Sequence, residues 1–552
     1  MSRLTDRSDF RFSVVRLCAV LMTVALLSAL LPIRSVDAAT IPTFTLQGVG
    51  YGHGLGMSQE GALQMAREGK TSTDIIKQYF TDVKLKTLGS SPRALVNLDS
   101  GKAARSSWTL SPGYASGKPS ADNAGDTLQV VSGSTTSSYT DLAGPYQFKV
   151  ASGVIAMYSV KTSKKLATFG TSVQVKPAVI DPGADLLTVV DGSGPFGHAN
   201  IRYRGYLKLT VSGTKLKLVN SVSMQHYLYG VVPREIGNAS DATMAAAEAQ
   251  ALCARSYAYP KASAGKELAC STSDQVYGGH SRFTSEANRK NNKATAFESA
   301  KSNAAIDATN NCYVAYKDKV VAAYFAACNG NASANSEDVW GSKLGYLRSR
   351  VDPWCAKSHK DHAWTVKVSG LALAKTLKTK GVTGAPSGAG SSVFVTDVTT
   401  LRGDGGWVKS AVITWSNGAS SQIALADNVR IKFGLRSANF TISNSLKTST
   451  SSGKATKPAA DTLTTYQENN KLIKRTKGKW KRVSHAKFSG KKAYRSSSYK
   501  GKITLRFKGT GVIWYGQTSA GGGRAKVYLD GKYKKTIQLK SSKTVRVKKI
   551  YE

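Results

Sequence analysis

Short runs in which hydrophobic and polar residues alternate recur along most of the chain and predict β-strands. The runs YLKLTV from Tyr206 and LKLVNSV from Leu216 predict the two strands of a hairpin. A second strand-rich block follows Tyr313, where YVAYKDKVVAAYFAAC predicts a hairpin that turns at residues 317–319. Because such runs are interrupted by only a few helical patterns, we expect an α+β fold that is rich in β-structure.

Three stretches show the spacing of apolar residues that is typical of helices. GALQMAREG is expected to end at Gly69, and STDIIKQYF to begin at Ser72 or Thr73. The alanine-rich run DATMAAAEAQALCARSYAY predicts the longest helix, with Asp241 as N-cap and an end at Pro260.

Five glycines occupy alternate positions from Gly48 to Gly56. If this run forms a strand, one of its faces carries no side chains. Such a face would allow a close approach by a ligand, for example a polysaccharide, or tight packing of the strand against the core. The opposite face would carry Val49, Tyr51, His53, Leu55 and Met57.

The N-terminus has the pattern of an export signal. Four arginines precede an apolar run from Leu17 to Leu31, and small residues then predict cleavage after Ala38. An uncleaved membrane anchor is the alternative interpretation. After residues 1–38 we expect a domain over 39–445, a Ser-, Thr- and Lys-rich linker over 446–460 and a small module over 461–552.

The chain of 552 residues has a formal net charge of +43, which predicts a polyanionic partner. Residues 461–552 contain 25 Lys or Arg and 4 Asp or Glu, a balance of +21. For an exported protein, anionic polymers of the cell wall are the expected partner. We expect no nucleic-acid partner, because only the charge would support one. The module itself has a β-sandwich pattern, with Ile503, Leu505 and Phe507 expected to point inward and a hairpin turn at 530–531.

Five cysteines remain after the predicted signal, which is an odd number. Outside the cell disulfides are permitted, and the pair that we expect is Cys328 with Cys355. The spacing of cysteines and histidines does not predict a metal site, and we expect no cofactor.

Glu235 is the best candidate for acid–base chemistry. It lies in YLYGVVPREIGN, where apolar and aromatic residues precede it. Desolvation in such surroundings raises the pKa of a carboxyl, as a general acid requires, although a carboxylate near a helix start needs no catalytic role. No second acidic residue lies close to it in sequence. One carboxyl suffices if a hydroxyl of the sugar itself is the nucleophile.

Several motifs together resemble the SpoIID/LytB family of stage II sporulation protein D and amidase enhancers. They are GYGHGLGMSQEGA, YLYGVVPREIGN, AQALCARSYAY, DQVYGG and the stretch from NGNASANSEDVWG to DPW, spanning about residues 44–355. Two positions depart from the family pattern. Ile236 stands where methionine is usual, and Asp274 stands where a cysteine is frequent, which argues against the zinc of some relatives.

The resemblance implies an exported lytic transglycosylase that cleaves peptidoglycan glycan strands to 1,6-anhydro products. Glu235 matches the glutamate of the GVVxxEM motif and would be its acid and base. The rival is a non-enzymatic enhancer or scaffold that serves an N-acetylmuramoyl-L-alanine amidase. The C-terminal module resembles a carbohydrate-binding jelly roll. The residues expected to bind the strand are His53, Ser58, Gln59, Arg255, Gln275, Tyr277 and Trp340.

Overall fold

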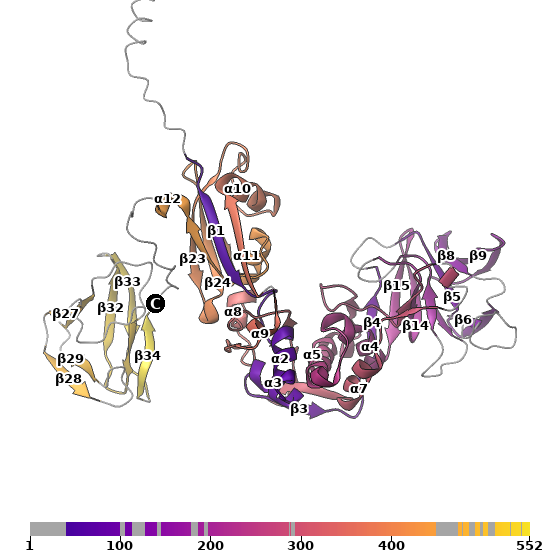
Figure 1. The fold of residues 1–552 in the computed structure, drawn as a ribbon, viewed down its shortest axis with the longest axis horizontal. Helices are drawn as coiled ribbons and strands as arrows, with labels where there is room; N and C mark the ends of the chain where they lie inside the picture. The colour runs from indigo at the N-terminus through magenta and orange to yellow at the C-terminus, as the bar shows by residue number, and fades with distance from the viewer. Residues whose placement is uncertain are drawn as a thin grey trace, which may run out of the picture. The chain divides into compact units, whose positions relative to one another are not determined.

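The chain divides into two compact units, residues 1–451 and 452–552, in a computed structural model (Figure 1). The predicted export signal lies outside the described residues. Within the described residues, every helix is too short or too polar to cross a bilayer. The structure describes residues 40–448 except 100–104, 113–126, 141–144, 178–185, 193–196, 286, 289–292 and 361, and separate stretches between 473 and 551.

Two sheets of mostly antiparallel strands face each other in the first unit and share one hydrophobic core. Trp108 and Phe148 from one sheet belong to the same buried cluster as Leu207 and Leu218 from the other. In spatial order, one sheet contains β10 (Lys165–Thr168), β9 (Val154–Ser159), β8 (Tyr146–Ala151), β5 (Ser107–Pro112), β12 (Leu187–Val189), β13 (Ile201–Tyr203), β17 (Ser281–Arg282) and β18 (Thr295–Ala296). The second contains β16 (Glu267–Ala269), β4 (Ala94–Asn97), β15 (Lys215–Val222), β14 (Tyr206–Ser212), β11 (Ser172–Pro177), β6 (Thr127–Ser132) and β7 (Thr135–Thr140). The predicted hairpin of β14 and β15 is confirmed.

A group of helices packs beside this sandwich, with the long helix α5 (Met244–Ser263) at its centre (Figure 1). Small alanines bring α5 close to its neighbours, and Ala246, Ala249 and Leu252 are buried. The neighbours are α2 (Gln59–Arg67), α3 (Ser72–Tyr79), α4 (Met224–Glu235) and α7 (Ala300–Ala308). The smaller strands of this region are β2 (Met57–Ser58), β3 (Val83–Thr87), β19 (Cys312–Tyr316), β20 (Lys319–Val320) and β21 (Phe325–Ala326).

The predicted helices exist, but three of their expected ends are wrong. Helix α3 begins after Thr71, whose side chain forms a capping box with Asp74. Asp241 begins a short 3-10 turn, η3 (Asp241–Thr243), before α5 starts at Met244. The helix continues through Pro260, because a proline in the last turn removes only one hydrogen bond.

The third region of the first unit joins the two ends of its sequence. Strand β1 (Thr43–Val49) lies between β22 (Ala363–Ser369) and β26 (Phe440–Asn444), antiparallel to both. It packs with a second sheet around a separate buried cluster that includes Trp415. The remaining elements are β23 (Val395–Arg402), β24 (Val408–Trp415), β25 (Ser420–Ala424), α8 (Ser336–Trp340), α9 (Cys355–Ser358), α10 (Gly370–Thr379), η4 (Asp404–Gly406), α11 (Ala426–Phe433) and α12 (Ser445–Thr448).

The prediction of an extended strand through the glycine run is wrong beyond Val49. Gly50, Gly52, Gly54 and Gly56 all have positive φ values, between +69° and +112°, so the chain winds through a tight loop. A Cβ at Gly50 would lie 2.8 Å from the carbonyl oxygen of Cys328. A Cβ at Gly54 would overlap the indole of Trp407, so the glycines serve tight packing rather than a bare face.

The second unit contains antiparallel pairs of strands. The predicted hairpin of β32 (Arg524–Leu529) and β33 (Lys532–Gln538) is confirmed, whereas its turn and Phe507 lie outside the described residues. Ile503 does not point inward as predicted, because 48% of its surface is exposed. The other pairs are β27 (Ile473–Thr476) with β30 (Lys502–Leu505), β28 (Trp480–Ser484) with β29 (Lys492–Ser496), and β31 (Trp514–Thr518) with β34 (Val545–Tyr551).

The predicted disulfide between Cys328 and Cys355 is confirmed, with 5.8 Å between the two Cα atoms. Cys253, Cys270 and Cys312 are not part of a disulfide. The disulfide links the segment after β21 to the start of α9. It lies next to the glycine loop, since Tyr51 of that loop forms an isolated bridge with Cys328.

Candidate active site

Glu235 is the last residue of helix α4. The helix begins at the N-cap Ser223, whose hydroxyl accepts a hydrogen bond from the backbone nitrogen of His226. It ends because the backbone turns at Gly237, which has a φ of +86°. Tyr227, Leu228, Val231 and Val232 are buried in the sandwich core, and they hold the helix so that Glu235 remains partly exposed at its end.

Two donors from distant parts of the chain hold the carboxyl of Glu235. The backbone nitrogen of Val276 donates to Oε1 at 2.6 Å, and Nε2 of Gln59 lies 3.4 Å from Oε2. Burial raises the pKa of Glu235, and these two hydrogen bonds act in the opposite direction. The arrangement therefore favours a carboxyl that holds a proton above the usual range and still has donors for its ionised form.

Gln59 reaches Glu235 because the segment after the glycine loop is tied down on two sides. Strand β2 pairs in parallel with β21, and Ser58 then caps α2 by accepting a hydrogen bond from the backbone nitrogen of Gly61. Gln59 is the first residue of that helix, and its Nε2 lies 3.4 Å from Oε1 of Gln250 on α5. The glycine-rich motif thus contributes a side chain to the carboxyl site from 176 residues away.

The loop after β16 carries Val276 and is anchored by Asp274. The buried carboxylate of Asp274 accepts hydrogen bonds from Nζ of Lys261 at 2.6 Å, from the hydroxyl of Tyr257 at 2.8 Å and from the backbone nitrogen of Ala269 at 2.7 Å. A cation bound at this carboxylate would face the ammonium of Lys261. The residues present therefore do not fit the zinc of some relatives, and Cys270 is a buried thiol.

Four aromatic rings form a continuous row beside the site. Tyr257 contacts Tyr324 with ring centroids 5.5 Å apart, Tyr324 contacts Trp340 at 4.7 Å, and Trp340 contacts His53 at 5.1 Å. The hydroxyl of Tyr257 donates to Asp274, two residues before Val276, whose backbone nitrogen donates to Glu235, so this end of the row lies near the carboxyl. Burial raises the pKa of Tyr257. Trp340 at the other side is 37% exposed.

His53 belongs to this row as a neutral ring. Its Nδ1 accepts a hydrogen bond from the backbone nitrogen of Leu55 at 3.0 Å. Burial lowers its pKa to about 4, so it carries no charge at pH 7. His53 is therefore suited to shape the site and contact a ligand, rather than to supply a proton.

Three of the residues predicted to bind the strand lie inside the protein instead. Arg255 is fully buried and donates to the backbone oxygens of Ile306 and Cys312. Gln275 bridges the hydroxyl of Tyr227 and the carbonyl oxygen of Ala254. Tyr277 packs against Tyr227 with ring centroids 5.3 Å apart and donates to Asn220. These contacts position helices α4 and α5, and Ser58 is likewise buried as a helix cap.

Tyr257, Tyr324 and the backbone nitrogen of Val276 were not among the site groups predicted from the sequence. Tyr257 lies in the motif AQALCARSYAY, two residues after Arg255, and Val276 lies in DQVYGG beside Gln275. The motifs therefore marked the right segments. The side-chain direction decided which residue of each segment faces the carboxyl, and that depends on packing between elements far apart in sequence.

Comparison with known proteins gives a family match that includes Glu235 and Val276. Residues 212–316 match the model of the stage II sporulation protein family, SpoIID. An amidase enhancer of Bacillus subtilis is 24% identical over 265 residues, which are 48% of this chain and 32% of that protein. A stage II sporulation protein D of Bacillus amyloliquefaciens is 48% identical over 48 residues, 9% of this chain and 14% of that protein.

A stretch of 167 residues resembles an uncharacterized protein of Brachyspira hyodysenteriae with 29% identity, covering 28% of this chain and 41% of that protein. In each case the matched part covers less than half of the relative's length. No solved structure matches the chain.

Proposed function

The chain belongs to the SpoIID/LytB family, and from this premise we propose that it is an exported lytic transglycosylase of peptidoglycan. Its substrate is the glycan strand, cut between N-acetylmuramic acid and N-acetylglucosamine. Glu235 is the catalytic acid and base. The supporting observation is a single partly buried carboxyl with a raised pKa, held by two donors at the end of α4.

Glu235 first donates its proton to the glycosidic oxygen as the bond to the anomeric carbon breaks. The carboxylate that results is stabilised by the hydrogen bonds from Val276 and Gln59. It then takes the proton of the muramic 6-hydroxyl, whose oxygen closes onto the anomeric carbon to give a 1,6-anhydro end. Because the nucleophile belongs to the sugar, no second acid is required to activate water.

A second carboxyl lies in the same region but is not available for this chemistry. This is the carboxyl of Asp274, which lies two residues before Val276, the residue whose backbone nitrogen donates to Glu235. The oxygens of Asp274 accept from Lys261, Tyr257 and Ala269. This arrangement favours the intramolecular route over hydrolysis by a pair of carboxyls.

The aromatic row supports binding of a polymer rather than a small molecule. Tyr257, Tyr324, Trp340 and His53 extend from the neighbourhood of Glu235 to the exposed side of Trp340. Sugar rings present apolar faces of C–H bonds that pack on aromatic rings. We propose that several sugars of one strand lie along this row while the scissile bond lies at Glu235.

The experiment that tests the enzyme is mass spectrometry of the products from purified glycan strands stripped of stem peptides. Glu235→Gln is expected to reduce release of 1,6-anhydro ends by at least about a hundredfold. Glu248→Gln, which removes a carboxyl of α5 outside the site, is the matched control and retains activity. If the unmutated protein releases no anhydro ends and still binds the strands, it is not a transglycosylase.

The second candidate is a non-enzymatic enhancer, because the match that covers 48% of the chain is to a protein named amidase enhancer. In that case Glu235→Gln would stimulate an N-acetylmuramoyl-L-alanine amidase as well as the unmutated protein does. A measurement of stem-peptide release by the amidase, with and without each variant, separates the two functions.

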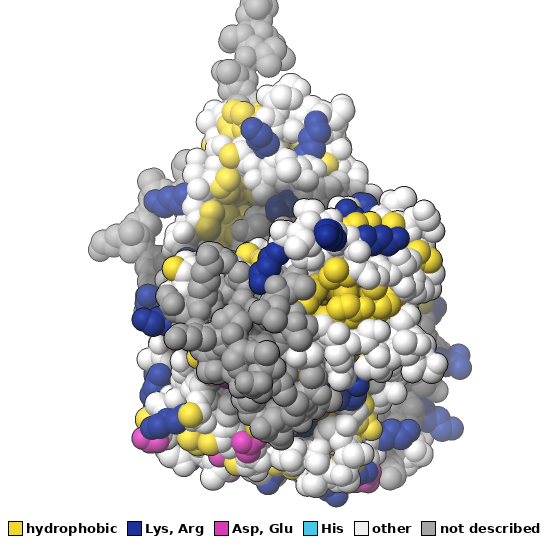
Figure 2. Space-filling model, turned by 90° about the vertical axis from the view of Figure 1, so that its right-hand side faces the viewer, with side chains coloured by type: hydrophobic (Ala, Val, Ile, Leu, Met, Phe, Trp, Pro, Cys, Tyr) yellow, Lys and Arg dark blue, Asp and Glu magenta, His cyan; other side chains and the backbone are white. Residues whose placement is uncertain are grey.

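The net charge supports attachment to anionic polymers of the wall. Lys and Arg side chains spread over the face in Figure 2, whereas Asp and Glu are seen only near its lower edge. Residues 461–552 of the second unit contribute +21 of the total +43. We propose that this charge keeps the enzyme close to the polymer mesh that surrounds its substrate.

A further inference from the structure

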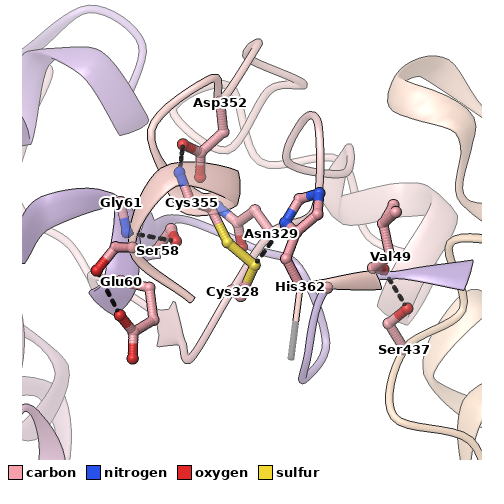
Figure 3. Close-up of a disulfide and its surroundings, with 12 residues drawn as sticks. Val49, Ser58, Glu60, Gly61, Cys328, Asn329, Asp352, Cys355, His362 and Ser437 are labelled. Carbon is pink, nitrogen blue, oxygen red and sulfur yellow. Dashed lines mark hydrogen bonds between the residues drawn. A yellow bond between two sulfur atoms is a disulfide. The ribbon is translucent and has the colours of Figure 1, made fainter. Parts of the chain in front are cut away.

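The disulfide between Cys328 and Cys355 lies in a cluster of nitrogen and sulfur atoms. Cys328 follows β21, Cys355 begins α9, and both side chains are fully buried. Figure 3 shows the imidazole of His362 turned toward Cys328, with Nδ1 3.5 Å from Sγ. The site is separate from Glu235 and has no part in the proposed reaction.

A second histidine approaches the same two sulfurs. His359 lies four residues after Cys355, so the two residues are about one helical turn apart along α9. The two sulfurs and a ring nitrogen of His359 all lie within 4.8 Å of one another. Cys328, Cys355 and His359 therefore form one group, and His362 places a second imidazole beside the sulfur of Cys328.

The cluster is not saturated by hydrogen bonds. Nδ1 of His359 is buried and has no hydrogen-bond partner within the described part of the chain. Such an atom costs free energy unless it finds a partner. The ring meets Tyr51 edge-on with centroids 6.5 Å apart, which leaves the nitrogen available to a ligand.

The surroundings fix the two cysteine-bearing segments. The carboxylate of Asp352 accepts a hydrogen bond from the backbone nitrogen of Cys355 at 3.2 Å and another from the hydroxyl of Tyr79 at 3.1 Å. The backbone nitrogen of Cys328 donates to the carbonyl oxygen of Tyr51, and the backbone nitrogen of Tyr51 donates to the carbonyl oxygen of Cys328. Neither segment relies on the disulfide alone for its position, so the thiols remain near each other after reduction.

We propose that reduction of the Cys328–Cys355 disulfide converts this cluster into a zinc site with Cys328, Cys355, His359 and His362 as its four ligands. Two thiolates and two imidazoles form a common tetrahedral zinc set. The reductant is a dithiol, which supplies two electrons and two protons and becomes a disulfide itself. Each cysteine thiol then loses its proton when it binds the metal.

The same two segments of the chain can then be linked in two alternative ways. In oxidising surroundings a covalent bond joins the segments that follow β21 and precede α9. In reducing surroundings a metal joins them through the same two cysteines. For tetrahedral zinc with bonds of about 2.3 Å to sulfur, the two sulfurs separate to roughly 3.8 Å, which a change of side-chain rotamer provides.

The test is a cobalt titration of the full chain, reduced with a phosphine that is then removed without oxygen. Reduced protein is expected to bind one equivalent of Co²⁺ with thiolate charge-transfer and tetrahedral absorption bands, which one equivalent of Zn²⁺ abolishes. Oxidised protein is expected to show neither band. His359→Ala is expected to weaken binding by at least about tenfold while both thiols remain.

The control is the double variant Cys328→Ser, Cys355→Ser, which keeps Cys253, Cys270 and Cys312, the described cysteines outside the disulfide. It is expected to give no thiolate bands. The proposal is overturned if this variant binds cobalt as the reduced protein does, or if the reduced protein shows no such bands. Circular dichroism confirms that each protein is folded, and His359→Ala decides the question if the double variant is not.

Discussion

Glu235 combines two opposing influences on one carboxyl. Burial disfavours its charge, and donors from Gln59 and Val276 favour it. The balance keeps the folded-state pKa above the ordinary value, so the proton is held more tightly in the folded protein than in the unfolded chain. Function at this residue therefore has a cost in stability wherever the carboxyl is ionised.

We expect Glu235→Gln to raise the free energy of unfolding at neutral pH. Above the unfolded pKa the unfolded chain ionises Glu235 freely while the fold resists it, and the amide removes that difference. Below the ordinary range of glutamate, both states are protonated and the stabilisation disappears. Urea unfolding at several pH values measures it, with Glu248→Gln as control. A variant less stable than the unmutated protein at pH 7 would contradict the direction of the shift.

A second prediction concerns Gln59, which we regard as a positioning residue. Gln59→Leu removes a donor to the carboxylate, so the pKa of Glu235 rises further. Because the reaction requires the protonated acid, the alkaline limb of the pH–activity profile is expected to move to higher pH. Gln64→Leu, one turn along the same helix, leaves the profile unchanged. A fall in activity with the same pH limbs would assign Gln59 to strand binding instead.

At the residue scale the sequence predicted a desolvated carboxyl with a raised pKa at Glu235, but not the groups that hold it. The apolar run before Glu235 and the family motif both indicated this carboxyl. Its donors come from residues 41 and 176 positions away, and no local pattern links them. Arg255, Gln275 and Tyr277 were misassigned because a polar or aromatic residue inside a motif is equally suited to anchoring the fold, as their burial shows.

The glycine loop is the element in which pattern and structure differ most. A period of two is typical of a strand, and it equally describes glycines that take positive φ at every second position. The rings and carbonyls that exclude side chains there come from Cys328, Trp364 and Trp407, about 300 residues later in the chain. The sequence indicated close approach correctly and left open whether a ligand or the protein itself approaches.

Substitution in this loop provides a direct test of that packing. Gly54→Ala is expected to destabilise the protein by at least about 3 kcal/mol, because φ is +75° and the new Cβ would overlap Trp407. Gly153→Ala is the matched control, with φ of +80° and open space around it, and is expected to cost about 1 kcal/mol. Equal losses, measured by thermal unfolding, would show that backbone conformation alone constrains Gly54.

At the scale of the whole molecule, charge is distributed between two units that differ in kind. The first unit contains the carboxyl site, and the second is an array of strand pairs rich in lysine. Composition indicated this division, because the excess of basic residues rises sharply after residue 460. Composition did not predict that Ile503 is exposed, since that depends on which strands pair.

Binding to anionic wall polymer is expected to weaken as salt rises, and the second unit is expected to dominate that dependence. Changing the exposed lysines Lys526, Lys534 and Lys535 to Gln should reduce the salt dependence of binding. The same change at Lys84, Lys208 and Lys375 of the first unit is the control, expected to have a smaller effect. Sedimentation with purified walls measures binding, and DNA added as competitor distinguishes wall polymer from nucleic acid as the preferred partner.

Strand β1 has a consequence for the order in which the molecule assembles. Its partners β22 and β26 begin more than 300 residues later, so a chain that emerges N-terminus first holds β1 unpaired until residue 369 has appeared, and β1 gains its second partner only after residue 444. The glycine loop and Gln59 follow β1 directly and take their positions from the same closure. Contacts of such long sequence separation form slowly. Helix α4 can thus fold before Gln59 takes its position at Glu235, and the activity proposed for Glu235 would begin only once β1 has both of its partners.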